Sequence, residues 1–182
     1  MSTILETERL IVRHWRLTDG ADAFAIYGDA EVTRYLADDS RDNTLAQTES
    51  WLAKKVETRA ENEPLGIWAV EERASGHVIG HAILQHASIN GDNRVELGYA
   101  FARAAWGHGY ATELAHTLLR FGFDTLNLTE IYGVILPENT ASRHVLEKIG
   151  MRSLGMGDYG GFPVEVLAID RLEQPSRIVS GS

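Results

Sequence analysis

The sequence predicts an α+β fold with one mixed, mostly antiparallel sheet flanked by helices. Three observations support this prediction. The 182 residues are enough for one domain with a sizeable core and too few for two ordinary domains. The middle of the chain holds strand-like segments joined by short turns. After this run of strands come a helix, a strand, a helix and a last strand, and the whole order indicates an α+β fold with one mixed sheet.

The first part of the chain is predicted to hold a strand and two helices. A first strand is expected at 10–15, with Leu10, Val12 and His14 on one face and Ile11 and Arg13 on the other. Thr18 and Asp19 offer oxygen atoms that can cap the short helix that follows. Thr44 can cap a longer helix over about 45–62, where apolar residues form part of a stripe.

Three strand-like segments follow, at 66–71, 77–86 and 94–101. Turn residues separate them, Ser75-Gly76 at the first connection and Asn90-Gly91 at the second. Such dipeptides join neighbouring antiparallel strands directly, so we expect an antiparallel meander.

The last part of the chain alternates between helices and strands. From Tyr110, apolar residues recur at intervals of three and four, which predicts a helix of about 16 residues. A strand is expected at 130–136, a helix at 140–149 and a last strand at 162–170.

Composition limits the class of protein. With 26 acidic and 17 basic residues the formal net charge is -9, so we expect no nucleic-acid partner. Cysteine is absent, which excludes disulfides and a cysteine nucleophile. We find no signal peptide and no apolar run of about 20 residues, and therefore expect a cytoplasmic protein without a membrane partner. One domain is expected at 1–172, with a flexible tail at 173–182.

A glycine-containing loop between a strand and a helix is the most informative segment. In VELGYAFARAAWGHGYATE, at 95–113, Gly107 and Gly109 directly precede the helix. Backbone N–H groups at a helix N-terminus favour an anion, and glycines let it approach the backbone. The pattern favours a phosphate site, although glycines also end strands for steric reasons. The P-loop and Rossmann patterns do not match.

A second candidate segment, PENTAS at 137–142, joins a predicted strand to a predicted helix. Asn139 is a good N-cap residue, and Ser142 lies in the first turn, where a hydroxyl is harmless. Helix capping alone is therefore one sufficient explanation of both residues.

Taken together, the segments resemble the GNAT superfamily of acyl-CoA-dependent N-acetyltransferases, and most closely its RimJ/RimL-type branch. The resemblance spans about residues 7–169 and rests on TERLIVR, HVIGHAIL, VELGYAF, WGHGYATE and PENTASRHVLEKIGM in that order. It implies the GNAT fold and acetyl transfer from acetyl-CoA to a primary amine of a protein N-terminus or a small molecule. Because no cysteine or activated serine triad is visible, we expect direct attack in a ternary complex.

The resemblance also implies which residues bind acetyl-CoA. The family pattern Q/R-x-x-G-x-G/A falls on 106–111, where Gly109 and Ala111 match and Trp106 stands in place of Gln or Arg, as is familiar in the RimJ/RimL-like branch. Loop N–H groups would hold the pyrophosphate, and the strand before them would pair with the pantetheine arm. The implied cofactor-binding residues are Tyr99, Phe101, Trp106, Gly107, His108, Gly109, Tyr110, Ala111, Thr112, Asn139 and Ser142.

One candidate catalytic residue acts on the leaving thiol. In many relatives a tyrosine a few residues after the asparagine protonates the thiolate, but no tyrosine follows Asn139 here. The resemblance implies that Ser142 takes its place, because a serine there is thought to hydrogen-bond the thiolate in the RimJ/RimL-like branch.

The other candidate catalytic residue is a base. A protonated amine must lose a proton before it attacks, and a carboxylate can accept that proton directly or through water. Glu96 leaves the strand face that its apolar neighbours occupy, and it stands near the catalytic glutamate of histone-acetylating relatives. Asp158, Glu165 and an ordered water are alternative bases. Ion pairing of Glu96 with Arg94 or His81 is the structural alternative.

Other functions also stay open. A non-catalytic acyl-CoA-binding module and an aminoglycoside-type N-acetyltransferase fit the same pattern. No metal site is expected, because His77 and His81 would lie about 13 Å apart on a strand. Tyr35, Trp51 and Trp68 are expected in the core or in a pocket wall. The sequence identifies neither the amine acceptor nor the oligomeric state, and a homodimer is one option.

Overall fold

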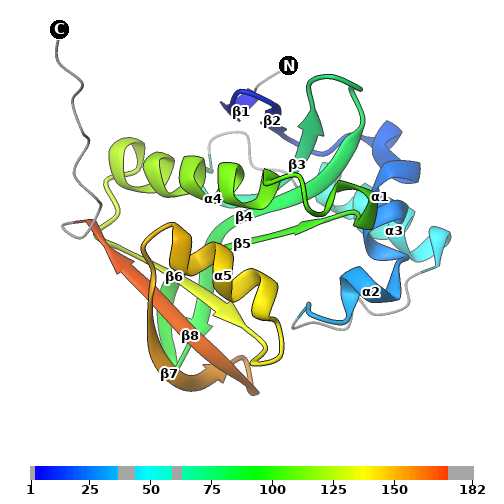
Figure 1. Cartoon of the computed structure of the whole chain (residues 1–182). Coiled ribbons are helices and arrows are strands. Elements are labelled where there is room, and N and C mark those ends of the chain that lie inside the picture. Colours follow the sequence, from blue (N-terminus) through cyan, green and yellow to red (C-terminus); the bar gives the residue numbers. More distant parts are fainter. Residues whose placement is uncertain (1–2, 37–43, 59–62, 172–182) are drawn as a thin grey trace, which may run out of the picture.

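The computed structural model describes residues 3–36, 44–58 and 63–171, and their strands form one eight-stranded sheet (Figure 1). The strands are β1 (Thr3–Glu6), β2 (Leu10–Arg13), β3 (Gly66–Glu72), β4 (Val78–Ile89), β5 (Asp92–Phe101), β6 (Glu130–Ile135), β7 (Arg152–Tyr159) and β8 (Phe162–Asp170). The helices are α1 (Gly20–Tyr27), α2 (Ala30–Thr33), α3 (Leu45–Glu57), α4 (Tyr110–Arg120) and α5 (Thr140–Lys148). None of the described helices is both long enough and apolar enough to cross a membrane.

The strand order is β1-β2-β3-β4-β5-β6-β8-β7. Every neighbouring pair in this order is antiparallel except β5 and β6, which run parallel. The mixed, mostly antiparallel sheet predicted from the sequence is therefore confirmed. The expected meander is the β3–β4–β5 unit, and its second turn has positive φ angles of 54° at Asn90 and 82° at Gly91.

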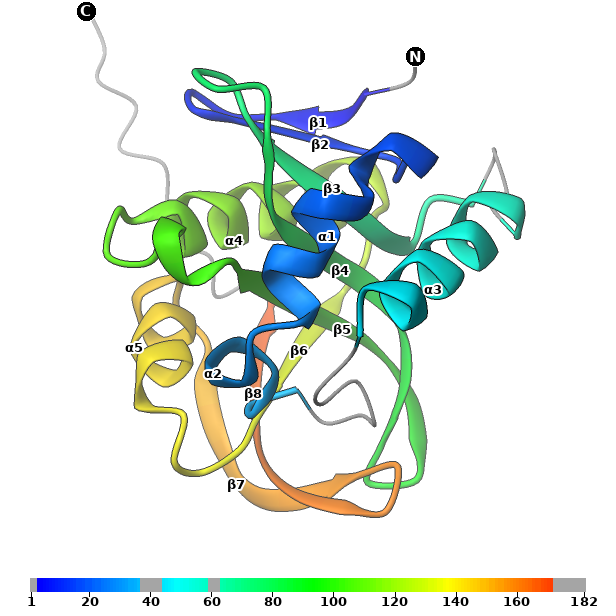
Figure 2. The ribbon, with the colours of Figure 1, turned by 90° about the vertical axis from the view of Figure 1, so that its right-hand side faces the viewer.

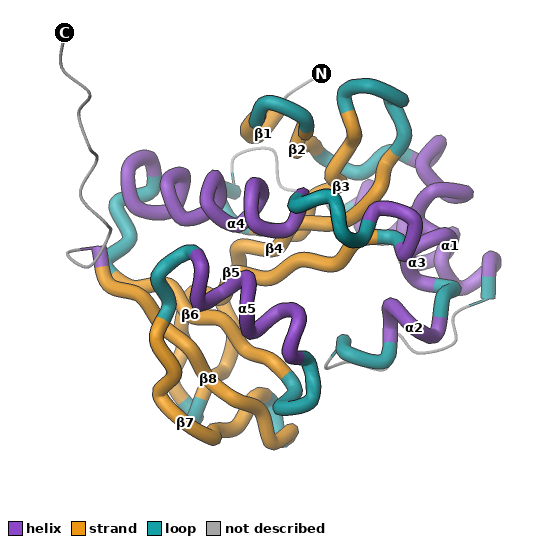
Figure 3. The backbone as a smooth tube through the Cα atoms, in the orientation of Figure 1, coloured by secondary structure: helices purple, strands orange, loops and turns teal. Residues whose placement is uncertain are grey.

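The parallel strands β5 and β6 pair over only a short stretch. The register pairs Glu96 of β5 with Tyr132 of β6, and Figure 3 shows β5 and β6 running in different directions over much of their length. Residues 97–101 pair with β4 on one side and have no ladder partner on the other side among the described residues. The second half of β5 is thus an open sheet edge inside the fold.

Helices cover both faces of the sheet. One face packs against α4 and α5, through buried residues such as Leu114, Leu118 and Leu146. The other face packs against α1, α2 and α3, in a cluster that includes Ile26 and Leu52. Figure 2 shows α4 and α5 to the left of the central strands and α3 to the right. The open edge of β5 lies between these two helical layers.

Three predicted features at the start of the chain need correction. The sheet begins one strand earlier than expected, at β1, and the one-turn helix α2 was not expected. Asp19 does not cap α1 with its side chain. Its carboxylate instead accepts hydrogen bonds of 2.8 and 2.9 Å from the Arg13 guanidinium and one of 2.8 Å from the Arg16 N–H. The Asp19 carboxylate therefore binds the buried Arg13 guanidinium instead of capping α1.

The other expected helices form, with small differences at their ends. The Thr44 side chain accepts from the Gln47 N–H, and the Gln47 side chain binds back to the Thr44 N–H, so the predicted cap is confirmed. Helix α3 ends at Glu57, and part of its expected extension lies at 59–62, outside the described residues. Helix α4 continues as a π-helical segment at 121–125. The expected tail at 173–182 also lies outside the described residues. Strand β7 was not expected.

Candidate active site

The glycine loop joins the end of β5 to the first turn of α4. Gly107 and Gly109 have φ angles of +80° and +79°, and Gly109 is the N-cap residue of α4. Residues other than glycine rarely adopt this left-handed region of backbone conformation, so both positions require glycine. Trp106 fastens the loop to the strand, because its Nε1–H donates a 2.8 Å hydrogen bond to the Phe101 carbonyl. The loop and the first turn of α4 therefore line the same cavity as the end of β5.

A cavity of about 430 Å³ lies between this loop, the end of β5 and the start of α5. All the predicted cofactor-binding residues line it except His108. The His108 ring instead stacks on the Tyr110 ring, with 5.7 Å between the ring centroids. A strand edge, a helix N-terminus and a groove between them can hold an extended ligand that ends in phosphate groups.

A second cavity, of about 220 Å³, adjoins the first. Glu96, His81 and Tyr159 line it together with other aromatic and apolar side chains. The residues that line both cavities are Tyr35, Leu36, Tyr99, Asn139 and Ser142. The two cavities therefore meet at the residues predicted to bind the thiol end of the cofactor.

Glu96 is the buried carboxylate of the smaller cavity, with 6% of its surface exposed. Burial raises its pKa above the ordinary value, and hydrogen bonds with Tyr159 and Gln85 oppose part of that rise. The Tyr159 hydroxyl donates to Oε2 of Glu96 over 2.8 Å. A carboxylate with a raised pKa in a cleft is a candidate proton acceptor.

Hydroxyl groups gather where the two cavities meet. The Tyr99 hydroxyl is buried and makes no hydrogen bond of normal geometry with the described residues. Burial raises the pKa of Tyr99 well above its usual range, and the nearby Ser142 side chain offsets only part of this rise. Asn139 caps α5, because its Oδ1 accepts a 3.1 Å hydrogen bond from the Ser142 N–H. The junction therefore presents neutral donors.

Comparison with known proteins identifies the family. Residues 9–152 match the family model described as the acetyltransferase (GNAT) domain. The chain belongs to the GNAT acetyltransferase family. It is 32% identical over 160 residues to the uncharacterized N-acetyltransferase YoaA of Bacillus subtilis, covering 86% of each chain.

Two solved structures have the same fold. A GNAT-family acetyltransferase from Bacillus anthracis is 25% identical, with a TM-score of 0.76 over 93% of this chain and 99% of that one. Mycobacterium smegmatis RimJ, solved in complex with CoA-disulfide, is 22% identical, with a TM-score of 0.69 over 92% of this chain and 84% of that one. These likenesses confirm the GNAT fold expected from the sequence.

Within this GNAT domain, the structure separates Glu96 from one expected partner. Arg94 pairs with Asp92 and Glu130 at the surface, so the predicted alternative of an Arg94–Glu96 ion pair is wrong. His81 shares a 2.8 Å hydrogen bond between its Nδ1 and the Tyr27 hydroxyl.

The two alternative carboxylates are engaged elsewhere in the GNAT domain. Asp158 is exposed near the end of β7, where its Oδ1 accepts from the N–H of Gly161 in the β7–β8 turn. Glu165 is buried, but it forms an ion pair with Arg143 and accepts a 2.7 Å hydrogen bond from the Ser153 hydroxyl. Neither carboxylate lines the two cavities. The geometry therefore favours Glu96 over both.

Two polar residues of the site were missed by the sequence analysis. Tyr159 reaches Glu96 from β7, a strand whose sequence RSLGMGDY lacks a clear alternation. Arg9 contacts the glycine loop from the turn between β1 and β2. It lies in the TERLIVR segment that carried the family resemblance, but nothing local to that segment indicates its partner.

Proposed function

We propose that the protein transfers the acetyl group of acetyl-CoA directly to a primary amine, within a ternary complex of both substrates. The observation that carries this proposal is the meeting of the two cavities at Tyr99, Asn139 and Ser142. One cavity leads to the glycine loop, and the other holds the buried Glu96 carboxylate. A thioester in the first cavity would reach an amine in the second without an intermediate carrier.

Acetyl-CoA binding is assigned to the larger cavity. The N–H groups from Gly107 to Thr112 would bind the pyrophosphate, because the helix N-terminus supplies both donors and positive potential. The pantetheine arm would extend along the open edge of β5 near Tyr99, and the side chain of Asn139 would bind it. The CoA-bound RimJ structure supports this proposal through the shared fold.

The proposed chemistry starts with a proton transfer from the substrate ammonium group to Glu96, directly or through water. The neutral amine nitrogen then attacks the thioester carbonyl carbon, while a backbone N–H of β5 polarises the carbonyl oxygen. The C–S bond then breaks, and the CoA thiolate leaves. The nitrogen loses its second proton, which reaches the thiolate through water, so the products are the amide and the free CoA thiol. The Ser142 hydroxyl would donate a hydrogen bond to that thiolate. The hydroxyl of Tyr99 lies at the same junction and can donate a second hydrogen bond there.

The smaller cavity favours a particular kind of amine. Glu96 is the only carboxylate among the described residues that line it, and the other lining residues include the aromatic side chains of Tyr27, Tyr35 and Trp51. Aromatic walls and one buried carboxylate suit a single ammonium group on an apolar body. An aminoglycoside carries several ammonium groups, which would need more carboxylates than these lining residues supply.

The RimJ/RimL-type branch belongs to the same proposal. Trp106 supports it, because tryptophan at this loop position was associated with that branch. An apolar N-terminal residue of a peptide presents one amine beside an apolar side chain, and so it fits the smaller cavity in the same way as a small monoamine.

A panel of amines tests the proposed function. Purified protein is mixed with acetyl-CoA and one acceptor at a time, and free CoA thiol is measured against time. The panel contains aryl and alkyl monoamines, apolar N-terminal peptides, polyamines and aminoglycosides. We expect turnover with the first two classes and the highest kcat/KM for an acceptor with one ammonium group. A protein that binds CoA but releases no thiol with any class would instead be an acyl-CoA-binding module.

A further inference from the structure

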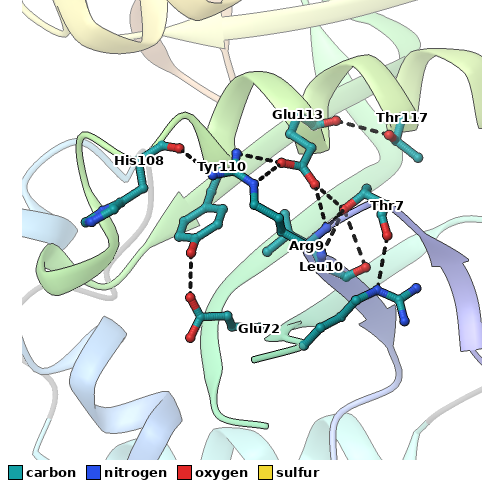
Figure 4. Close-up of polar contacts among 9 residues, drawn as sticks. Thr7, Arg9, Leu10, Glu72, His108, Tyr110, Glu113 and Thr117 are labelled. Atoms are coloured by element: carbon teal, nitrogen blue, oxygen red, sulfur yellow. Dashed lines mark hydrogen bonds and ion pairs between the residues drawn. The ribbon is translucent and has the colours of Figure 1, made fainter. Parts of the chain in front are cut away.

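A cluster of polar side chains lies behind the glycine loop, and the proposed chemistry does not use these side chains (Figure 4). Its members come from four parts of the chain: the β1–β2 turn, the end of β3, the loop itself and the first turn of α4. They are Thr7, Arg9, Glu72, His108, Tyr110 and Glu113. Figure 4 shows Thr7 and Arg9 at the Glu113 carboxylate, the His108 carbonyl at the Arg9 guanidinium, and the Glu72 carboxylate at the Tyr110 hydroxyl.

Arg9 contacts the loop and the helix at once. Its Nη1 donates a 2.9 Å hydrogen bond to the His108 carbonyl, between the two left-handed glycines. Its Nε donates a 2.7 Å hydrogen bond to the Glu113 carboxylate, and its backbone N–H donates another of 3.0 Å. The guanidinium carbon also lies 4.5 Å from the centroid of the Tyr110 ring. One side chain therefore joins three successive parts of the loop and helix.

Tyr110, the first residue of α4, is held on several sides. Its ring stacks on His108 and lies under Arg9, and its hydroxyl donates to the Glu72 carboxylate. Tyr110 also lines the larger cavity. The contacts behind the loop therefore fix a residue whose other side faces the proposed pyrophosphate site.

Glu113 presents an electrostatic problem for an anion site. It lies in the first turn of α4, where a carboxylate is favourable for the helix dipole. The same negative charge would repel a pyrophosphate bound at that N-terminus. Partial burial raises the pKa of Glu113, but hydrogen bonds from Thr7 and Arg9 lower it overall, so the side chain is charged at neutral pH. The ion pair with Arg9 cancels this charge.

We propose that Arg9 is a positioning residue for acetyl-CoA: it holds the loop through the His108 carbonyl and neutralises Glu113, so that the loop N–H groups attract the pyrophosphate. Its donors are already directed at the His108 carbonyl and the Glu113 carboxylate. Arg9 therefore acts through the loop and does not bind the phosphate itself. The inference rests on the proposed function only in assigning the pyrophosphate to this loop.

The test compares Arg9→Met with a matched control, Arg73→Met, in the full chain. Arg73 lies beside the same β1–β2 turn and forms an ion pair with Glu6 and a 3.1 Å hydrogen bond to the Thr7 carbonyl, but none of its described contacts reaches the loop. Binding of CoA is measured by calorimetry. We expect Arg9→Met to weaken CoA binding about tenfold, the loss expected for a charged hydrogen-bonded contact. Arg73→Met should leave CoA binding unchanged.

A truncated substrate separates positioning from general damage. S-acetylpantetheine keeps the thioester but lacks the pyrophosphate, so its kcat/KM should be the same in Arg9→Met and in the unmodified protein. Equal losses with acetyl-CoA and S-acetylpantetheine would overturn the inference. If the unmodified protein itself bound CoA no better than pantetheine, the loop would not be the pyrophosphate site. The assignment of acetyl-CoA to this loop would then fail independently of Arg9.

Removal of the opposing charge provides a second test. Glu113→Gln in the Arg9→Met background should recover much of the lost CoA affinity, and Glu113→Gln alone should not weaken CoA binding. Arg9→Lys keeps the positive charge but loses the planar guanidinium with its several N–H donors. Its CoA affinity should lie between that of Arg9→Met and that of the unmodified protein. If the double variant bound CoA as weakly as Arg9→Met, Arg9 would be a purely structural contact. The same would follow if Glu113→Gln alone bound CoA as weakly as Arg9→Met.

Discussion

The Tyr159 hydroxyl and the Glu96 carboxylate are joined by a 2.8 Å hydrogen bond between residues 63 positions apart. The bond ties the β7–β8 hairpin to β5 in the wall of the smaller cavity. Burial raises the pKa of Glu96, and the bond from Tyr159 acts in the opposite direction. The last hairpin of the fold therefore tunes the protonation of the proposed base.

Tyr159→Phe should move the acidic limb of the pH profile of kcat/KM to higher pH. The substitution removes a donor that stabilises the carboxylate, so the pKa of Glu96 rises further and less of it is ionised at a given pH. The loss near pH 7 should be a few-fold, as for one hydrogen bond. Tyr132→Phe is the control, because its hydroxyl donates to the exposed Glu130 instead. Equal shifts in both variants would argue against the link.

Glu96→Gln should abolish most of kcat near pH 7 and leave CoA affinity nearly unchanged. Glutamine keeps the size of the side chain and an oxygen for Tyr159, but it cannot accept a proton from the ammonium group. Part of the rate should return at high pH, where more of the free amine is present. Full activity at pH 7 in a folded Glu96→Gln protein would move the role to a bound water.

The same variant should not be less stable at neutral pH. A carboxyl group whose pKa is raised on folding holds its proton more tightly in the folded state, so its contribution to stability falls as pH rises through the folded pKa. Glutamine avoids this loss. Thermal unfolding should therefore give a Tm at pH 7.5 at or above that of the unmodified protein, and any gain should disappear below the ordinary glutamate pKa of 4.5. A lower Tm at pH 7.5 would indicate a structural role for the charge.

Asn139 can be tested separately as a cap and as a cofactor ligand. Asn139→Ala should lose about 1 kcal/mol of stability and also raise the KM for acetyl-CoA. Asn139→Asp keeps a good cap oxygen for the Ser142 N–H but replaces the amide donor with a carboxylate. It should keep the stability and still raise KM. An unchanged KM in Asn139→Asp would leave capping as the whole role.

Ser142→Ala should lower kcat more than it raises the KM for acetyl-CoA. The hydroxyl is proposed to stabilise the leaving thiolate, whose charge develops only as the C–S bond breaks. Steady-state kinetics with the best acceptor measure both constants. A change confined to KM would make Ser142 a ground-state contact of the pantetheine arm.

Gly109→Val should weaken CoA binding severely. The φ angle of +79° is strained for any L side chain, and valine would also crowd the approach of an anion. Gly91→Val carries a comparable strain, at φ +82° in the open β4–β5 turn, and should lose stability without losing CoA affinity. Thr112→Ala should cost only about 1 kcal/mol of binding, because the loop acts mainly through its backbone. Similar CoA affinities for the two glycine variants would contradict the assignment of the phosphate site.

Local patterns predicted much of this fold. The meander has short turns with turn-forming dipeptides, and α4 has a regular apolar stripe, so the sequence predicted both. Strand β1 has four residues and α2 has four, which is too short for a period to show. Most of β7 is exposed and contains Gly155 and Gly157, so it lacks the alternation that marks a strand.

The part of the candidate site that lies in one continuous segment could also be predicted, and the part built from distant segments could not. The glycine loop is contiguous in sequence, and its helix N-terminus could be recognised before the structure was known. Contacts between distant segments could not, because no local pattern relates Tyr159 to Glu96 or Arg9 to Glu113, residues 63 and 104 positions apart. The side chains that adjust the site come from elements whose partners only the folded sheet brings together.

Thiol release with and without the amine tests the central claim most directly. Acetyl-CoA is mixed rapidly with a known amount of protein, first alone and then with the best acceptor from the panel, and free thiol is counted per protein molecule. Direct transfer at the junction of the two cavities requires no release without amine and one thiol for each acetylated amine with it. A burst of one thiol per protein molecule before any amine is added would show an acetylated enzyme, and would contradict the account.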